Sequence, residues 1–158
     1  MKFLADGMLG KLTRWLRILG QDVKYSSNLS DEELTSLSKK DRRVLLTRDF
    51  ELYQRSIASG LNAFYIEIEE HAGRLAELSK NFNIPLKFDF ATSRCPKCNH
   101  KLRSTTREKI ARQIEKNTFN NYEEFWLCPK CGQIYWHGAH WGRIQATLRE
   151  AEEKLRLS

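Results

Sequence analysis

Two Cys-x-x-Cys pairs constrain this chain more than any other feature. Cys95-Pro-Lys-Cys98 and Cys128-Pro-Lys-Cys131 are separated by 29 residues. Each pair can form a tight turn that presents two thiolates to one ion, and four thiolates make the closed tetrahedral shell of structural zinc. Gly132 follows the second pair and suits a backbone that needs a positive φ. We therefore predict one structural Zn²⁺, with an iron centre or disulfides as the alternatives.

Strand-like and helix-like segments alternate through the first part of the chain. The apolar runs predict strands at Lys2–Ala5, Val23–Tyr25, Val44–Thr47 and Asn62–Ile66. Helical spacing, capping patterns and stop signals predict helices from about Met8 to Leu19, from Ser30 to Lys39, from Phe50 to Ala58 and from His71 to Asn81. This order predicts an α/β sandwich around a mainly parallel sheet.

The charge of the chain divides it into two unequal halves. Of the net charge of +7, residues 1–91 contribute 14 Lys/Arg and 13 Asp/Glu, and residues 92–158 contribute 13 and 7. We therefore expect an α/β domain over residues 1–91 and a zinc-ribbon domain over residues 92–158, which includes a last helix from about Trp141 to Leu155. Eight basic and two acidic residues lie in Arg94–Lys116. Such a cluster suits a polyanion, although a solvated surface has the same composition.

Three aspartates are the candidates for chemistry. Asp6 and Asp49 each fall immediately after a predicted strand, so both should lie in the crevice at the carboxyl edge of the sheet. Asp31 opens the second predicted helix. Converging carboxylates can hold Mg²⁺ or Mn²⁺, which polarise a phosphodiester and lower the pKa of a bound water. The alternative is that Asp6 and Asp49 cap helices and that Asp31 is only favoured by a helix dipole.

The basic and aromatic residues suggest where nucleic acid would bind. Lys11, Arg14 and Arg17 are three residues apart on one predicted helix, so we expect a basic stripe on its exposed face. The predicted contacts to RNA are Lys11, Arg14, Arg17, Arg48, Lys101, Arg103, Arg107, Trp136, His140 and Trp141. Basic side chains would hold phosphates, and exposed aromatic rings would stack on the bases of a single strand. The alternatives are an ordinary solvated helix face and a small aromatic core inside the ribbon.

These blocks resemble a known family. The stretch from Phe3 through Asp6-Gly-Met-Leu-Gly-Lys11 to Asp22 is similar to the opening of the Mut-seven C-terminal ribonuclease family. Ser30-Asp-Glu-Glu-Leu and Arg43-Val-Leu-Leu-Thr-Arg-Asp49 resemble its next two blocks. The two cysteine pairs, followed by Ile134-Tyr-Trp-His-Gly-Ala-His-Trp141, resemble its zinc-ribbon half. The blocks occur in the same order over nearly the whole chain.

The resemblance implies a PIN-type nuclease domain joined to a zinc ribbon, and an RNA-cutting activity that uses divalent metal. By this resemblance Asp6 takes the place of the first PIN acid, at the end of the first strand. Asp31 takes the place of the acid that opens the helix before the third strand. Asp49 takes the place of the acid in the Thr-x-Asp block. A further acid, usual on a middle helix of PIN nucleases, has no counterpart here.

We therefore expect a metal-dependent ribonuclease with zinc as a structural cofactor and Mg²⁺ or Mn²⁺ as catalytic ions. One alternative is a non-catalytic RNA-binding module with a degenerate PIN-like fold. Another is an antitoxin-like protein whose ribbon docks on a protein partner. The chain shows no secretory signal and no apolar run long enough to span a bilayer, so we expect a cytoplasmic protein that does not contact membranes.

Overall fold

A four-stranded parallel sheet forms the centre of the first half of the chain. The computed structural model describes all residues from Met1 to Ser158. The strands are β1 (Lys2–Ala5), β2 (Asp22–Tyr25), β3 (Val44–Thr47) and β4 (Ala63–Tyr65). They lie in the order β2-β1-β3-β4, and each neighbouring pair is parallel. The predicted α/β class and parallel sheet are confirmed.

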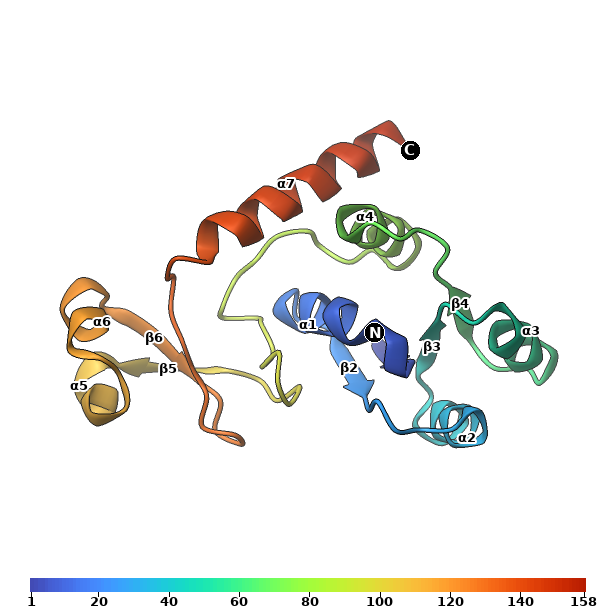
Figure 1. The fold of residues 1–158 in the computed structure, drawn as a ribbon, viewed down its shortest axis with the longest axis horizontal. Helices are drawn as coiled ribbons and strands as arrows, with labels where there is room; N and C mark the ends of the chain where they lie inside the picture. Colours follow the sequence, from blue (N-terminus) through green and yellow to red (C-terminus); the bar gives the residue numbers. More distant parts are fainter.

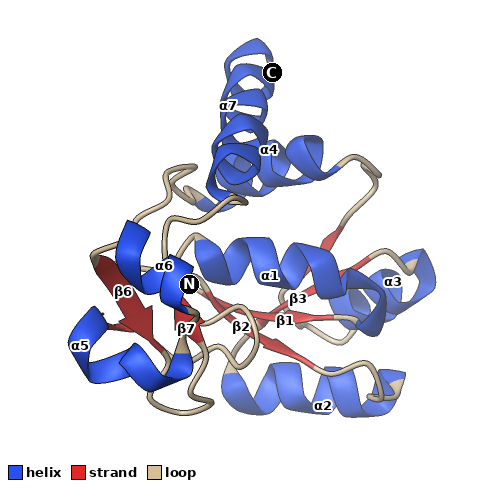
Figure 2. Ribbon diagram, turned by 60° about the vertical axis from the view of Figure 1, so that its left-hand side comes forward, coloured by secondary structure: helices blue, strands red, loops and turns tan.

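Helices cover both faces of this sheet (Figure 2). They are α1 (Gly10–Ile18), which follows the 3-10 turn η1 (Gly7–Leu9), α2 (Asp31–Asp41), α3 (Phe50–Ala58) and α4 (His71–Phe82). One face of the sheet, with Phe3 and Leu46, belongs to a buried cluster with residues of α1 and α4. The other face, with Leu4 and Leu45, packs in a smaller cluster with residues of α2 and α3. The alternation of side chains along each strand therefore produces two separate cores.

Local sequence signals explain where two of these helices begin. The Ser30 hydroxyl accepts from the N–H of Glu33, and the Glu33 carboxylate accepts from the N–H of Ser30, so the predicted capping box is present. The Asp49 carboxylate accepts from the N–H of Leu52 and caps α3. These caps fix the two loops that follow β2 and β3.

The second half begins as a small antiparallel ribbon. Its strands are β5 (Arg103–Thr106), β6 (Glu124–Leu127) and β7 (Ile134–Tyr135), in the order β5-β6-β7. Between β5 and β6 lie α5 (Arg107–Ile110), the 3-10 turn η2 (Ala111–Gln113) and α6 (Lys116–Asn121). This insertion accounts for the long gap between the cysteine pairs. Ile110, Phe125 and Ile134 form the ribbon's own buried cluster, which is small.

The last helix, α7 (Trp141–Leu157), leaves the ribbon and returns to the first half. It lies beside α4, as Figure 1 shows. Leu148 and Ala151 are buried in the cluster that contains Phe3 and Leu46 of the sheet. Lys154 forms an ion pair with Glu70 at 3.1 Å. The division expected from the sequence groups this helix with the ribbon half, and in the structure the apolar stripe of α7 packs on α4.

Candidate functional site

The four cysteine thiols converge on one point. Their sulfur atoms all lie within 4.8 Å of one another. The Sγ atoms of Cys95 and Cys131 are 3.7 Å apart, and those of Cys98 and Cys128 are 3.3 Å apart. A tetrahedral shell with zinc–sulfur bonds of about 2.3 Å separates its sulfur atoms by about 3.8 Å. The thiols, all free, therefore fit one structural zinc ion.

The backbone of each cysteine turn has the shape that such a site needs. Asn99 and Gly132, the residues after each pair, have φ values of 73° and 79°. Their N–H groups donate to the carbonyl oxygens of Cys95 and Cys128 at 2.8 and 2.9 Å. The positive φ predicted for Gly132 is therefore present, and asparagine is among the few other residues that adopt it readily.

Burial and mutual contact perturb the ionisation of these thiols. Burial, followed by hydrogen bonding with the other cysteines, raises the pKa of Cys98 to about 12. Burial also opposes ionisation of Cys128, but hydrogen bonds from the backbone of the second turn bring its pKa to about 7. Thiols this close cannot all ionise without a cation, so the site is chemically incomplete without a bound metal.

Arg17 connects the first cysteine turn to the α/β half, and this corrects the prediction made for it. Its side chain is buried at 6% exposure. The guanidinium donates to the carbonyl oxygen of Val23 through Nε and Nη2, at 3.0 and 2.7 Å, and to that of Pro96 through Nη1 at 2.9 Å. Burial lowers the pKa of Arg17, and the nearby charges of Cys95 and Cys98 oppose that shift. Arg17 is therefore a structural bridge and not part of an exposed RNA-binding stripe.

The same cysteine turn also completes the open edge of the sheet. Strand β2 is an edge strand. The Asn99 side chain accepts from the N–H of Val23 at 3.0 Å and donates to the Asp22 carboxylate at 2.7 Å. Asp22 in turn accepts from the buried Arg43 guanidinium at 2.8 Å. The first cysteine turn therefore shields an edge that would otherwise be free to pair with another chain.

Asp6 and Asp49 lie at the carboxyl edge of the sheet and share a partner. The buried Thr47 hydroxyl donates to Oδ2 of Asp6 at 2.8 Å and accepts from the N–H of Asp49 at 2.9 Å. The Asp6 carboxylate does not cap the helical turn that follows it. Asp49 caps α3 through Oδ1 alone. Oδ1 of Asp6 and Oδ2 of Asp49 accept no hydrogen bond within the chain, so each acid retains a free oxygen.

Asp31 is held differently. It occupies the first turn of α2, where Ser30 and Glu33 already supply the cap, and its carboxylate pairs with the Arg55 guanidinium of α3. The four cysteines are the only group of three or more Cys, His, Asp or Glu side chains with ligand atoms within 4.8 Å of one another. The structure therefore links Asp6 and Asp49 through Thr47. The carboxylate oxygens of all three aspartates do not lie within 4.8 Å of one another.

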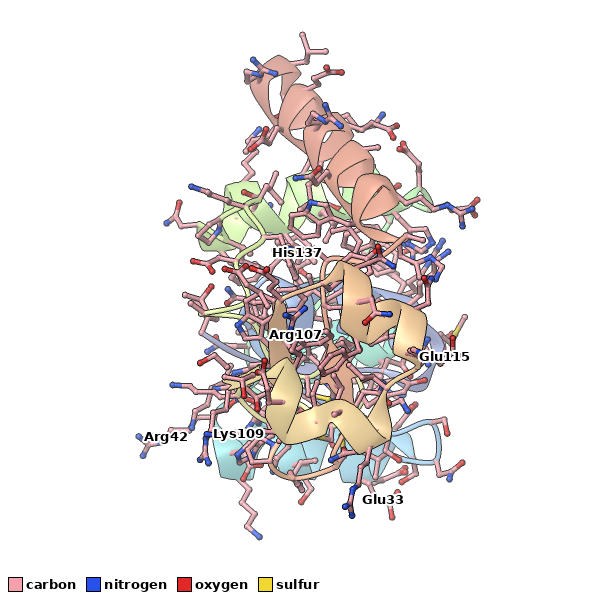
Figure 3. The ribbon with its side chains drawn as sticks, turned by 90° about the vertical axis from the view of Figure 1, so that its left-hand side faces the viewer. Glu33, Arg42, Arg107, Lys109, Glu115 and His137 are labelled. Carbon is pink, nitrogen blue, oxygen red and sulfur yellow. The ribbon has the colours of Figure 1, made fainter.

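The remaining predicted basic contacts have different surroundings. Lys11 and Arg14 are exposed on α1, and Lys101 and Arg103 are exposed on the ribbon. Arg48 lies 3.6 Å from the Glu69 carboxylate. Arg107 and Lys109 belong to α5, on the side of the ribbon seen in Figure 3.

Arg107 is partly engaged within the ribbon. Its guanidinium lies 5.1 Å from the centre of the Phe119 ring and donates to the Phe119 carbonyl oxygen at 3.2 Å. We therefore expect Lys101 and Arg103 to be more readily available to phosphates than Arg107.

An apolar cavity lies between the ribbon and the rest of the molecule. It has a volume of about 420 Å³, and Trp136, His140 and Trp141 line it together with residues from the loop before the first cysteine turn. The three predicted ribbon contacts thus belong to one concave site. Ile18, at the end of α1, also lines the cavity. Because α1 runs back from the carboxyl edge of the sheet, this cavity lies at the opposite end of the sheet from Asp6.

Two residues of this region were missed from the sequence. Phe88 and Phe90 line the cavity and belong to an aromatic cluster around His137. The Phe90 ring stacks on Trp126 with centroids 4.1 Å apart, and Phe88 meets Trp141 at 4.7 Å. Both phenylalanines stand in a loop without helical or strand periodicity. Phe88 and Phe90 reach the cavity only because the fold brings their loop against Trp126 and Trp141, so no local sequence signal could have identified them.

Comparison with known proteins decides the family. The family model described as the Mut7-C RNase domain matches residues 1–148. This chain belongs to the Mut7-C RNase domain family. The match confirms the resemblance seen in the sequence, and membership of an RNase family implies RNA as the substrate. The Mut7-C match spans both the sheet and the ribbon, so the two halves belong to one family unit.

The other comparisons add no individual relative. Neither the curated proteins nor the solved structures include a match to this chain. Among the helices of the structure, none has the length and apolar character needed to cross a membrane.

Proposed function

We propose that this Mut7-C domain is a ribonuclease that uses Mg²⁺ or Mn²⁺ at Asp6 and Asp49 and carries a structural zinc in its ribbon. The observation that supports this most strongly is the link from Asp6 through Thr47 to Asp49, at the edge where open parallel sheets bind their ligands. A site of four metal-binding thiolates requires reduced cysteines, which also favours a cytoplasmic location for the protein.

The donor atoms at this edge fit a hard divalent cation. Asp6 and Asp49 each offer a carboxylate oxygen that has no partner within the chain. Carboxylate oxygens are the ligands that Mg²⁺ and Mn²⁺ prefer. When bound, such an ion polarises a phosphodiester and lowers the pKa of a bound water.

The residues around these acids have supporting roles in the proposal. Thr47 fixes the orientation of the Asp6 carboxylate, and the α3 cap fixes that of Asp49. Lys11 and Arg14 on α1 and Arg48 after β3 would hold the phosphates on either side of the cut. Asp31 would act from α2 as an outer acid whose charge Arg55 partly compensates.

The ribbon would hold a more distant part of a single-stranded RNA. Trp136 and Trp141 in the apolar cavity offer surfaces on which bases stack, and Lys101 and Arg103 offer charge for phosphates. Helix α1 spans about 13 Å between the two sites at 1.5 Å per residue. We therefore expect the ribbon to improve binding only for RNAs that are long enough to reach both sites.

A second candidate is a non-catalytic RNA-binding module. The ion pair between Asp31 and Arg55 favours it, because that pair compensates the charge of Asp31 and leaves Asp6 and Asp49 as the two of the three acids without an ion pair. A binding module would still use the ribbon cavity and the basic surface.

One experiment separates the two. End-labelled single-stranded RNA is incubated with the zinc-loaded protein in Mn²⁺, in Mg²⁺ and without divalent metal, and both cleavage and binding are measured. The proposal expects cleavage in metal that falls by at least two orders of magnitude in Asp6→Asn and in Asp49→Asn. Glu152→Gln, an exposed acid on α7, is the matched control and should cut at the parental rate. Binding without cleavage in every metal would favour the module.

A further inference from the structure

Three aromatic rings form a partly exposed cluster beside Asp49. Phe50 and Tyr53 lie on α3 and Tyr65 ends β4. The ring centroid of Phe50 is 5.2 Å from that of Tyr65 and 6.0 Å from that of Tyr53, and the two tyrosine rings are 6.0 Å apart. We call these three residues the aromatic platform. None of them belongs to a buried hydrophobic cluster of the protein.

The exposure of the platform needs an explanation. Phe50 has half of its surface in contact with solvent. Leaving a phenylalanine ring in water forfeits the free energy that its burial would provide. Partly exposed rings next to a polar crevice offer surfaces on which bases can stack.

The register of the sheet places the platform next to the candidate catalytic acids. In the pairing of β3 with β4, Tyr65 is the direct partner of Thr47. Thr47 is the residue that holds Asp6 and Asp49. Phe50 directly follows Asp49 in the chain. Neighbouring strands are about 4.8 Å apart, so Tyr65 lies about one strand spacing from Thr47 and two from Asp6.

Side-chain alternation puts these groups on the same face of the sheet. Leu45 packs with α2 and α3, whereas Leu46 packs with α1 and α4, so Thr47 again faces α2 and α3. Tyr65 is paired with Thr47 and therefore shares that face. Asp6 follows Ala5, which packs toward α1 and α4, so it returns to the face of Thr47. Acids and rings thus lie side by side across β1, β3 and β4.

Arg48 stands between Thr47 and Asp49 in the chain and adds a positive charge at the same edge of the sheet. A nucleotide carries both a phosphate for such a charge and a base for the rings.

We propose that the aromatic platform binds the base of a nucleotide adjacent to the cut phosphodiester in single-stranded RNA. This inference rests on the proposed function, since it takes the acid edge as the place where RNA is cut. Stacking of this kind tolerates any base, because each base has a π face. The platform therefore positions the strand at the cut site without selecting a sequence.

The test uses the full zinc-loaded protein and a single-stranded RNA of twelve nucleotides, without divalent metal so that no cutting occurs. 2-Aminopurine is placed at successive positions, and its fluorescence reports stacking while anisotropy reports affinity. We expect quenching at one position near the site of cleavage. Phe50→Leu, which keeps the side chain apolar but removes the ring, should abolish that quenching and weaken binding about ten-fold. Phe50→Trp should restore both.

An abasic nucleotide at the quenched position supplies the decisive comparison. In the parent it should weaken binding about ten-fold, whereas in Phe50→Leu it should cause no further loss, since both changes remove the same contact. Ile57→Ala, an exposed apolar residue on the same helix without a ring, is the matched control and should behave like the parent. Circular dichroism and zinc content establish that each variant is folded.

Distinct outcomes separate this inference from the proposed function. Parental quenching and affinity in Phe50→Leu would overturn the platform, whether or not the parent cuts RNA. Quenching that depends on Phe50 in a protein that never cuts RNA would support the platform and contradict the nuclease. A parent that dimerises in light scattering, with Phe50→Leu monomeric and unaltered in RNA binding, would identify the platform as a protein interface and overturn the inference.

Discussion

Arg17 Nη1 donates a hydrogen bond of 2.9 Å to the carbonyl oxygen of Pro96, which stands 79 residues further along the chain. This contact joins helix α1 to the first cysteine turn. Ser93 adds a hydrogen bond from its hydroxyl to the Ile18 carbonyl oxygen at 2.6 Å, and Asn99 binds β2. The cysteine turn is therefore part of the α/β half as well as of the ribbon.

Removal of zinc should consequently loosen more than the ribbon. We expect one equivalent of zinc per chain, and chelation should raise amide hydrogen exchange in β2 and the end of α1 as well as in β5 and β6. Helix α3, which does not contact the cysteine turn, is the internal control. Unchanged protection throughout residues 1–91 after complete chelation would show that the ribbon folds and unfolds alone.

Replacement of Arg17 should destabilise the whole protein. Arg17→Met removes three hydrogen bonds from a buried guanidinium and leaves two carbonyl oxygens without them. The free energy of unfolding of the zinc-loaded protein should fall by about 2–4 kcal/mol in urea denaturation. Arg14→Met, on the exposed side of the same helix, should change it by less than about 0.5 kcal/mol. Equal effects of the two substitutions would contradict the structural role of Arg17.

The helical geometry explains why Arg17 does not lie on the exposed basic stripe that the sequence predicted. At 3.6 residues per turn, a step of three residues falls about 60° short of a full turn, so Arg17 lies about 120° around the helix from Lys11. That rotation carries Arg17 from the exposed face to the face buried by the first cysteine turn. The carbonyl oxygen that Arg17 binds belongs to Pro96, far along the chain, so the local sequence pattern could not predict this contact.

Other features were predictable because their causes are local. The strand Val44–Thr47 and the helix Phe50–Ala58 match the prediction residue for residue, since an apolar run and an aspartate cap define them. The cysteine spacing likewise predicted the four-thiol cluster. In contrast, the docking of α7 on α4 depends on a match between two apolar stripes far apart in sequence. A stripe read from one helix does not reveal which surface buries it.

Thr47 should matter to activity out of proportion to its effect on stability. Thr47→Val keeps the shape but removes the hydroxyl that orients Asp6 and binds the N–H of Asp49. We expect kcat for RNA cleavage to fall about ten-fold or more while the free energy of unfolding falls by only about 1–2 kcal/mol. Thr47→Ser, which retains the hydroxyl, should recover most of the rate. A fully active Thr47→Val would mean that Asp6 needs no positioning.

The ribbon should contribute much of the salt dependence of RNA binding. Replacing Lys101, Arg103 and Arg107 with Gln should reduce the slope of log K against log salt by up to about 2, at roughly 0.7 per phosphate contact on a single strand. Binding is measured without divalent metal. Replacing the exposed Lys39 and Lys40 of α2 is the matched control for lost charge and should leave the slope nearly unchanged. Equal slopes in the parent and the ribbon variant would identify the ribbon charges as a solvated surface.

The central claim is that Asp6 and Asp49 together hold the metal that cuts RNA. The most direct test is a crystal of the zinc-loaded protein soaked in Mn²⁺, in which anomalous density locates the ion. We predict a manganese peak at about 2.2 Å from a carboxylate oxygen of each aspartate, next to the Thr47 hydroxyl. Soaked crystals of a preparation that cuts RNA, with no manganese at these two carboxylates, would contradict the claim.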